Sequence, residues 1–442
     1  MTELYAIILF ITVLLFLLGT GVWVGLALMG VAWFGMELFT TRPVGDAMVT
    51  TIWASSSSWT LTALPLFIWM GEILFRSRLS ADMFNGLAPW LSWLPGRLLH
   101  VNIVGCGVMA AVAGSSAVTC ATVARMSIPE LRKRGYDESL SIGTLAGSGT
   151  LGLLIPPSIM LIVYAAIAEL SPLRLYAAAI IPGFLLAGSY IIYVIIRVMI
   201  NPSIAPKPRE EDIPPRRVVY WQLLTSFVPL TVLIMLVLGS ILGGLATPAE
   251  AAAMGAFGGL LLAAVYRSLN WVMLKESVYL TAKATAMVCW LFVGSWTFAS
   301  VFSYLGGHEI IEHFVLGFEL QPWQFLVMVQ IIIFLLGWPL EWSEILIIFV
   351  PIFLPMLDTF GVNPYFFAML VALNLQTSFL TPPMAMSAYY LKGVLGKAIE
   401  LVDIFKGIIP YVFIVIFIMV MMYQFPQIAL WLPDYFFGKY IP

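Results

Sequence analysis

Long apolar stretches separated by short polar segments follow one another along the whole chain. Most of them reach the roughly 20 residues that an α-helix needs to cross the hydrocarbon core of a bilayer. The pattern predicts about ten membrane-spanning helices, at residues 4–20, 22–40, 59–75, 139–168, 172–200, 221–244, 248–266, 285–304, 364–390 and 406–425. We therefore expect an all-α protein that crosses the membrane many times.

Two further apolar regions, residues 99–131 and 322–357, are too long for one crossing and are interrupted near their middle. The first contains Gly114-Ser115-Ser116, and the second contains Trp338-Pro339. A helical hairpin that enters the membrane and returns to the same side fits both regions, because irregular backbone at membrane depth is tolerated where protein or a water-filled cavity covers it. We expect two re-entrant hairpins with their tips at these residues.

The distribution of basic residues tests this arrangement, since Lys and Arg collect in cytoplasmic loops. If the two hairpins do not cross the membrane, every basic cluster falls on one side; if they cross, the clusters divide between the sides. The clusters are Arg76 with Arg78, Arg97, residues 132–134, the loop 201–217, Arg267 with Lys275, and Lys392 with Lys397. Both termini are then expected on the outer face.

Composition agrees with a membrane protein and excludes several other classes. Hydrophobic residues make up 61% of the chain and charged residues 10%, against roughly 45–50% and about 25% in soluble domains. The net charge of -2 provides no basic patch for nucleic acid. The three cysteines are scattered through apolar segments and indicate neither a disulfide framework nor a transition-metal site. No set of His, Asp, Glu and Cys has the spacing of a catalytic centre, so we do not expect an enzyme.

The chain repeats itself at a single offset of 226 residues. Pro129, Gly135 and Pro156-Pro157 recur without a gap as Pro355, Gly361 and Pro382-Pro383. The loop RKRGYD after the first hairpin is basic, whereas its counterpart LDTFGVN carries no positive charge, so the copies are expected to have opposite orientations in the membrane. Proline and glycine are common in membrane helices, but their frequency does not explain a matched set. Interrupted segments at corresponding places of inverted halves indicate a secondary transporter with a binding site near the midplane.

The two Pro-Pro pairs must interrupt their helices, because proline lacks the amide hydrogen and clashes with the preceding turn. The freed carbonyl oxygens need a partner in hydrocarbon, and a sodium ion is one. The first candidate site comprises Ser115, Ser116, Gly152, Ile155 and Pro156; the repeat offset gives a second at Ser378, Thr381 and Pro382, beside the tip near Gly337. The alternative is a proline kink whose carbonyls are capped by nearby hydroxyls, with no ion bound.

The hairpin tips also present helix N-termini toward the middle of the membrane, where backbone amides favour an anion such as a carboxylate. The candidate substrate contacts are Ser116, Thr119, Ser148, Thr150, Asn374, Gln376 and Thr377. The same groups would serve equally as hydrogen-bonding contacts between helices. Arg125, about 13 Å beyond the first tip, either extends to the interface or pairs with a substrate carboxylate. Glu341 and Glu344 either cap the helix that leaves the second tip or attract a cation.

The chain resembles the large membrane subunit of tripartite ATP-independent periplasmic (TRAP) transporters. The resemblance is strongest in Ala113–Asp137, Gly149–Ile159, Ala246–Leu261 and Val350–Pro383. It implies an elevator mechanism in which a transport domain slides against a scaffold. At least two sodium ions would drive a small organic anion inward across the bacterial inner membrane. It also implies two partners, a small four-helix membrane subunit and a periplasmic substrate-binding protein. The alternative is a stand-alone elevator carrier that needs neither.

The resemblance further implies positions for the sites and the domains. Family sodium sites carry over onto Ser115, Ser116, Gly152, Ile155 and Pro156, and onto Gly337, Ser378, Thr381 and Met384. Many relatives have glycine where this chain has Ser378. The expected division is scaffold helices at 1–75, the first transport-domain repeat at 76–168, scaffold helices at 169–284 with the cytoplasmic loop 201–220, the second repeat at 285–400, and a C-terminal scaffold helix and tail at 401–442.

Overall fold

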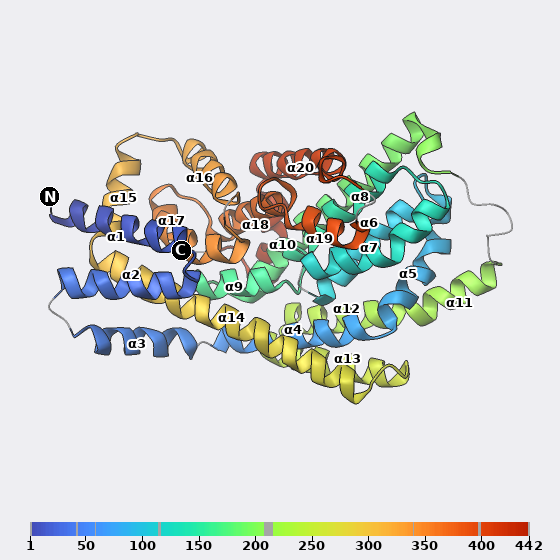
Figure 1. Ribbon diagram of the computed structural model, residues 1–442, viewed down its shortest axis with the longest axis horizontal. Helices are drawn as coiled ribbons and strands as arrows, with labels where there is room; N and C mark the ends of the chain where they lie inside the picture. The colour runs from blue at the N-terminus through green and yellow to red at the C-terminus, as the bar shows by residue number, and fades with distance from the viewer. Residues whose placement is uncertain are drawn as a thin grey trace.

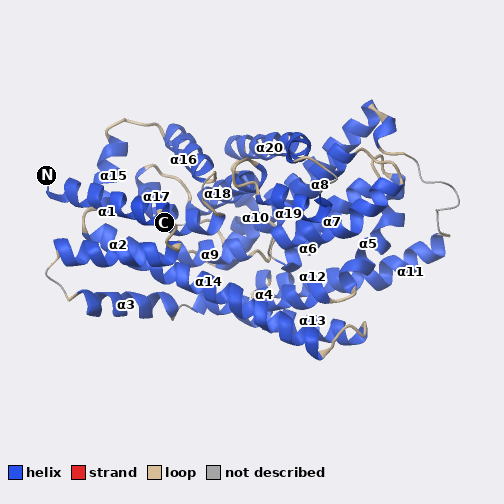
Figure 2. Ribbon diagram, in the orientation of Figure 1, coloured by secondary structure: helices blue, strands red, loops and turns tan. Residues whose placement is uncertain are grey.

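The structure is a computed structural model that describes residues 2–40, 43–57, 59–113, 116–206, 215–338, 340–396 and 399–440. Every regular element within these ranges is a helix (Figure 2). The predicted all-α class is therefore confirmed for the described chain.

The helices run from the N-terminus, at the left of Figure 1, through a bundle that is elongated in this view. The first half comprises α1 (Thr2–Gly19), α2 (Val24–Phe39), α3 (Val44–Ser56), α4 (Trp59–Arg76), α5 (Leu79–Trp90), α6 (Leu98–Ala113), α7 (Ser116–Lys133), α8 (Glu138–Gly149), α9 (Ile159–Ile167), α10 (Pro172–Ile200) and α11 (Arg216–Ser226). The second half comprises α12 (Val228–Leu242), α13 (Pro248–Val265), α14 (Trp271–Tyr304), α15 (Gly307–Leu316), α16 (Pro322–Leu336), α17 (Trp342–Thr359), α18 (Pro364–Leu380), α19 (Met386–Leu395), α20 (Leu401–Gln424) and α21 (Gln427–Phe437). Short 3-10 helices, η1 (Leu91–Trp93), η2 (Thr150–Leu153) and η3 (Pro202–Ile204), complete the described elements.

Length and composition would let six helical segments among the described residues cross a membrane: α10, α11 with α12, α13, α14, α17 and α20. A seventh follows if α3 and α4 form one bent span. The multi-spanning character is thus confirmed. The number ten stays a prediction, because Tyr5–Gly19 of α1, α2 and α18 each have fewer than 18 residues and the predicted span 139–168 is broken into α8, η2 and α9. The re-entrant course of both predicted hairpins, α6 with α7 and α16 with α17, also stays a prediction; α17 alone has the length and composition of a crossing helix.

The helix α14 begins at Trp271, well before the predicted start at residue 285, and its 34 residues make it the longest of the described helices. It crosses the lower half of Figure 1 and packs against α2 and α4. A Cβ on Gly294 would lie 2.5 Å from the carbonyl oxygen of Gly25, so α14 and α2 meet backbone to backbone. Near the N-terminus of α14, Glu276 accepts a hydrogen bond of 2.7 Å from Arg76 of α4. These contacts join α2, α4 and α14 into one packed group.

The predicted repeat is present in the helices themselves. Both bounds of α17 equal the bounds of α7 shifted by 226 residues. Each helix is followed by a glycine in the left-handed conformation, Gly135 with φ of 72° and Gly361 with φ of 63°. Only glycine adopts such angles without a steric penalty, and its use after a helix C-terminus lets the chain turn back. The two glycines predicted as repeat mates therefore perform the same local task.

The equivalence continues into the next helix of each copy. Asp137 caps the N-terminus of α8 by accepting a hydrogen bond from the amide of Leu140, and its repeat mate Asn363 caps α18 by accepting from Tyr365. Both helices then end before a Pro-Pro pair, α8 through η2 and α18 at Leu380, and a short helix follows each break. The predicted interruption of both segments is confirmed.

The closest packing in this part of the molecule lies between α8 and α20, which run beside each other in the upper part of Figure 1. A Cβ on Gly143 of α8 would lie 2.8 Å from Cε2 of Tyr411 and 3.0 Å from the backbone carbon of Gly407. Backbone atoms of α20 cannot rotate away as a side chain would. The α8–α20 contact therefore depends on glycine at this position.

We expect Gly143→Ala to lower the free energy of unfolding of the purified protein in detergent by about 1–3 kcal/mol, and hence its melting temperature, because overpacking has this cost in well-packed interiors. Gly188→Ala on α10 is the matched control, since a Cβ there meets nothing within 4 Å. Thermal unfolding followed by tryptophan fluorescence measures both variants. Equal melting temperatures for the two would contradict the contact described above.

Candidate functional site

The tip of the first hairpin lies directly against the first broken helix. A Cβ on Gly152 of η2 would lie 3.5 Å from both the amide nitrogen and the hydroxyl oxygen of Ser116, the first residue of α7. The structure thus brings together two residues that the sequence predicts for the first ion site. Ser115, the neighbouring member of the predicted site, lies outside the described residues.

The Pro-Pro pair leaves a carbonyl oxygen of this segment without its helical donor. Pro156 and Pro157 occupy the positions whose amides would bond to the carbonyls of Gly152 and Leu153 in a continuous helix. The hydroxyl of Ser158 donates to the Leu153 carbonyl over 2.8 Å and replaces one of these donors. Among the described side-chain hydrogen bonds, none has the Gly152 carbonyl as its acceptor. The Gly152 carbonyl oxygen therefore lacks its helical donor, in a residue that adjoins Ser116.

Ile155, another predicted member, has its side chain engaged in packing, which leaves its main chain for the predicted site. Its side chain packs toward α10, where a Cβ on Gly183 would lie 3.1 Å from its Cγ1. On the other side, a Cβ on Gly107 of α6 would lie 3.7 Å from its Cδ1. These contacts fix the break between α6 and α10.

The second tip meets the second broken helix in a related way. A Cβ on Gly337, directly after α16, would lie 2.9 Å from Cβ of Ser378 and closer still to its hydroxyl. Ser378 is the repeat mate of Gly152, and Pro382 stands where its carbonyl would find a donor in a continuous helix. The predicted pairing of this tip with Ser378 is therefore present in the structure.

The surroundings of the second break differ from those of the first. The hydroxyl of Thr381 donates to the Thr377 carbonyl over 2.8 Å, and the Thr381 carbonyl accepts from the amide of Ala385 over 3.0 Å. Met384 stands at the repeat position of Ser158 and brings no hydroxyl to the break. Pro382 is exposed, whereas Pro156 is buried. The two sites are thus related by the repeat but differ in detail: Gly152 lies in the 3-10 helix η2, Ser378 lies in the α-helix α18, and the nearby side chains are unequal.

Four of the predicted site residues carry buried polar atoms without a protein partner: the hydroxyls of Ser116, Thr119 and Ser378, and the amide nitrogen of Gln376. These four residues are exposed by at most 4%. Buried polar groups normally find a hydrogen-bonding partner, so each of these atoms calls for water, an ion or a ligand. The residues present at both tips therefore fit an ion that binds through oxygen.

The remaining substrate candidates are mostly engaged within the protein. Asn374 donates to the carbonyl of Gln330 on α16 over 2.7 Å, and Thr377 donates to the Asn374 carbonyl over 2.6 Å. Ser148 donates to the carbonyl of Thr144 within α8. These bonds favour a role in packing for Asn374, Thr377 and Ser148.

Arg125 differs from the other substrate candidates in its exposure. It is exposed on α7, whereas they are buried. Of its two predicted roles, exposure favours extension to the interface. Glu341 and Glu344 form a capping box at the N-terminus of α17, in which the amide of Glu341 donates to the Glu344 carboxylate over 3.1 Å. The capping role predicted for these two residues is confirmed.

A buried polar network that the sequence interpretation missed attaches the first hairpin to α8. Asn102 of α6 donates to the hydroxyl of Thr144 on α8 over 3.0 Å and accepts from the hydroxyl of Ser127 on α7. All three residues are fully buried. The single Asn within the apolar run at 99–113 was the available signal, since a polar amide there must find partners.

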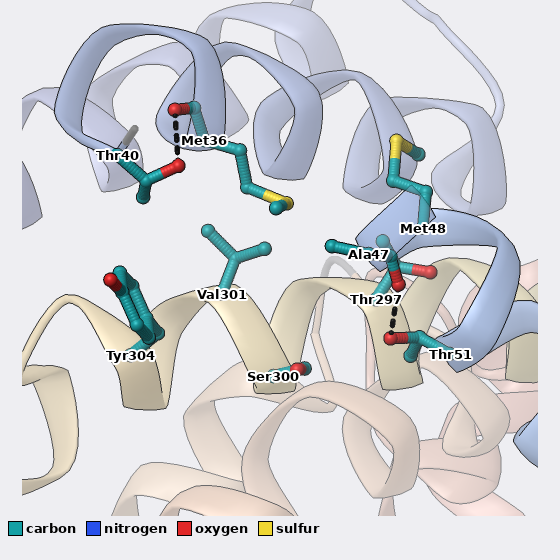
Figure 3. A pocket seen from close by; sticks show the side chains of 9 residues that line it. All are labelled: Met36, Thr40, Ala47, Met48, Thr51, Thr297, Ser300, Val301 and Tyr304. Carbon is teal, nitrogen blue, oxygen red and sulfur yellow. Dashed lines mark hydrogen bonds between the residues drawn. The ribbon is translucent and has the colours of Figure 1, made fainter. Parts of the chain in front are cut away.

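A separate cavity of about 60 Å³ opens between α2, α3 and α14 (Figure 3). Its lining residues are Met36, Thr40, Ala47, Met48, Thr51, Thr297, Ser300, Val301 and Tyr304. The hydroxyls of Thr40 and Thr51 each donate to a carbonyl of their own helix, over 2.8 Å and 2.9 Å. No lining residue belongs to a hairpin tip or a broken helix, so this cavity is distinct from both candidate ion sites.

Comparison with known proteins agrees with this architecture. Residues 10–428 match the family described as "Tripartite ATP-independent periplasmic transporter, DctM component". The C4-dicarboxylate TRAP transporter large permease protein DctM of Pseudomonas aeruginosa is 29% identical over 392 residues, which cover 88% of this chain and 90% of that protein. The sialic acid TRAP transporter large permease protein SiaM of Vibrio cholerae is 26% identical over 428 residues, covering 92% and 98%.

A solved structure shares the fold at low sequence identity. The crystal structure of the Alcanivorax borkumensis YdaH transporter, described as having an unusual topology, superposes with a TM-score of 0.64 at 15% identity. The match covers 95% of this chain and 99% of that one. The helical arrangement described above is therefore similar to that of a known transporter over nearly its full length.

Proposed function

This chain belongs to the DctM component family of tripartite ATP-independent periplasmic transporters, and on that premise we propose that it carries a small organic anion inward across the bacterial inner membrane, coupled to sodium. It is a multi-pass permease component and not an enzyme. The proposal includes the coupling to sodium, the inward direction of transport and the location in the bacterial inner membrane.

The observation that carries the proposal is the pair of equivalent breaks, each placed against a hairpin tip. At one tip Ser116 adjoins Gly152, and at the other Gly337 adjoins Ser378. Both serine hydroxyls are buried without a protein partner. Unwound backbone carbonyls with nearby hydroxyls are the means by which transporters bind sodium near the midplane. This geometry supports at least two sodium ions, one at each break.

We propose an elevator mechanism with inverted repeats, in which the broken helices and hairpins move together. The contacts suggest which helices travel with them: α20 packs on α8 and α18, and α10 packs on α9 and α18. In contrast, α14 packs mainly on α2, α3 and α4, although it also touches α17 of the second hairpin. We therefore include α10 and α20 in the moving body and α14 in the scaffold, which shifts the boundaries that the sequence predicts at residues 169, 285 and 401. The division itself stays a prediction.

For the substrate we propose a small organic acid in its anionic form. Relatives carry names that specify C4-dicarboxylate, sialic acid, isethionate and 2,3-diketo-L-gulonate. All four compounds are small and bear at least one acidic group. The unpartnered amide nitrogen of Gln376 and the hydroxyl of Thr119 provide hydrogen-bond donors for such a group.

We propose two protein partners. A periplasmic binding protein would deliver the substrate, as the family description with its word "periplasmic" suggests. A small membrane subunit would complete the permease: a relative named as the isethionate TRAP transporter permease protein DctMQ from Oleidesulfovibrio alaskensis is matched over 60% of its length by 87% of this chain. The unmatched part of that longer protein leaves room for such a subunit.

Uptake into proteoliposomes tests the proposal. The full chain is reconstituted with and without a binding protein and a small membrane subunit of the same type of transporter, taken from the same organism, and radiolabelled succinate and sialic acid are the probes. We expect accumulation of a probe only with both partners and an inward sodium gradient. Accumulation by the chain alone would support the stand-alone carrier instead. Equal accumulation with potassium in place of sodium would remove sodium coupling.

A further inference from the structure

Two residues that are repeat mates touch each other in the core of the molecule. The hydroxyl of Thr150 lies 2.8 Å from the amide oxygen of Gln376, and the two residues are separated by 226 positions, the offset of the repeat itself. A two-fold axis relates each residue of one copy to its mate in the other copy, on the opposite side of the axis. The two mates can therefore touch only where they both lie close to the axis. The pseudo-two-fold axis of the repeat therefore passes close to Thr150 and Gln376.

The chemistry of this pair leaves one atom unsatisfied. The Thr150 hydroxyl has a single hydrogen but two oxygen neighbours at 2.8 Å, the Gly147 carbonyl and the Gln376 amide oxygen. If the hydroxyl donates to Gln376, the amide nitrogen of Gln376 is left without a partner. If the amide is turned by half a rotation, its nitrogen donates to Thr150 and its oxygen is left instead. Both side chains are fully buried, so the pair is joined but incomplete in either arrangement.

The pair stands beside both candidate ion sites. Thr150 begins η2 and precedes Gly152 by two residues, and Gln376 precedes Ser378 by two residues on α18. The other hydrogen-bonded amides of this region act within one copy: Asn102 bonds to Thr144, and Asn374 bonds to Gln330. Among the described side-chain hydrogen bonds, the contact between the mates therefore joins the segment that contains Gly152 to the segment that contains Ser378.

We propose that the Thr150–Gln376 pair couples the two ion sites, so that an ion at one break favours binding at the other. This inference rests on the proposed function, because it requires sodium at both breaks. Each ion would hold the carbonyl of Gly152 or Ser378 in place, and the hydrogen bond across the axis would transmit that order to the other copy. Coupling of this kind makes sodium binding cooperative, with a Hill coefficient that reaches at most the number of sites.

The test is a sodium titration of the purified full-length chain, followed as the rise in melting temperature, with choline replacing sodium at constant ionic strength. The variant Thr150→Val removes the hydroxyl at nearly constant volume, and Thr150→Ser is the matched control that keeps it. We expect a Hill coefficient above 1 for the wild type and for Thr150→Ser, and about 1 for Thr150→Val. Half-saturation of Thr150→Val should move to about fivefold higher sodium, the effect of losing one hydrogen bond.

A second variant approaches the pair from the other copy, in case Thr150→Val does not fold. Gln376→Leu should lower the Hill coefficient to the same extent. If Thr150→Val folds, adding it to Gln376→Leu should change nothing further, because the two residues act through one contact. A wild-type Hill coefficient of 1, or wild-type cooperativity in both single variants, would overturn the coupling and leave sodium binding intact. If the wild type shows no sodium-specific stabilisation at all, the proposed sodium sites fail together with their coupling.

Discussion

Replacing Ser116 with leucine is expected to abolish sodium-dependent uptake while the protein is still inserted and folded. The Ser116 hydroxyl is buried, has no protein partner, and lies against Gly152 at the first break. A leucine side chain would remove this oxygen and fill the space in which an ion would meet the Gly152 carbonyl. Uptake in proteoliposomes with its partners should therefore fall to the level measured without a sodium gradient.

The smaller change Ser116→Ala separates loss of the oxygen from steric blockage. Loss of a residue that only holds a metal ligand in place lowers metal affinity by about 10- to 100-fold. We therefore expect the sodium concentration at half-saturation to rise by about 10-fold or more in Ser116→Ala. Ser189→Leu on α10 is the control, because Ser189 is half-buried and its hydroxyl donates to the Leu185 carbonyl of its own helix. Normal sodium activation of both Ser116 variants would remove the first ion site.

Gly337→Ala is expected to cause a comparable loss at the second break. The added Cβ would lie 2.9 Å from Cβ of Ser378 and closer to its hydroxyl, so the second tip must move away from α18. We expect sodium-dependent uptake to fall by about tenfold or more, the effect of about 1.4 kcal/mol or more at the site.

The control for this substitution is Gly393→Ala on α19, where a Cβ would meet nothing within 4 Å. Both variants are measured by initial uptake rate against sodium concentration, after their amounts in the liposomes are matched. A Gly337→Ala protein with the sodium dependence of the Gly393→Ala protein would show that the second tip does not take part in ion binding.

Much of the architecture could be predicted because it depends on local chemistry. Gly135 and Gly361 mark the ends of α7 and α17, since both take the left-handed conformation that glycine allows. The helices α3 and α5 were not predicted from the apolar pattern: their segments are short and include polar residues such as Asp46 and Asp82. Their helical state depends on packing against neighbours, such as α14 for α3 and α11 for α5.

The candidate site was predictable only in part. The interrupted helix and the first hairpin tip predicted that Ser116 lies near Gly152, the repeat offset predicted that Gly337 lies near Ser378, and the structure has both contacts. The bond between Asn102 and Thr144 was not predictable, because it depends on how α6 and α8 are rotated about their axes. Successive residues of a helix point in directions that differ by about 100°, so the rotation of the helix about its axis decides whether a side chain meets a neighbour.

The sequence by itself determined where the two helices break and that the breaks are equivalent, because the missing amide hydrogen of proline and the offset of 226 residues belong to the covalent chain. Only the tertiary structure decided which oxygens remain unpaired. Ser158 is bonded to a carbonyl while Ser116 is not, and Thr150 meets its own repeat mate. The physical reason is that a hydrogen bond forms only within about 3 Å, a distance set by the packing of helices that lie far apart in sequence.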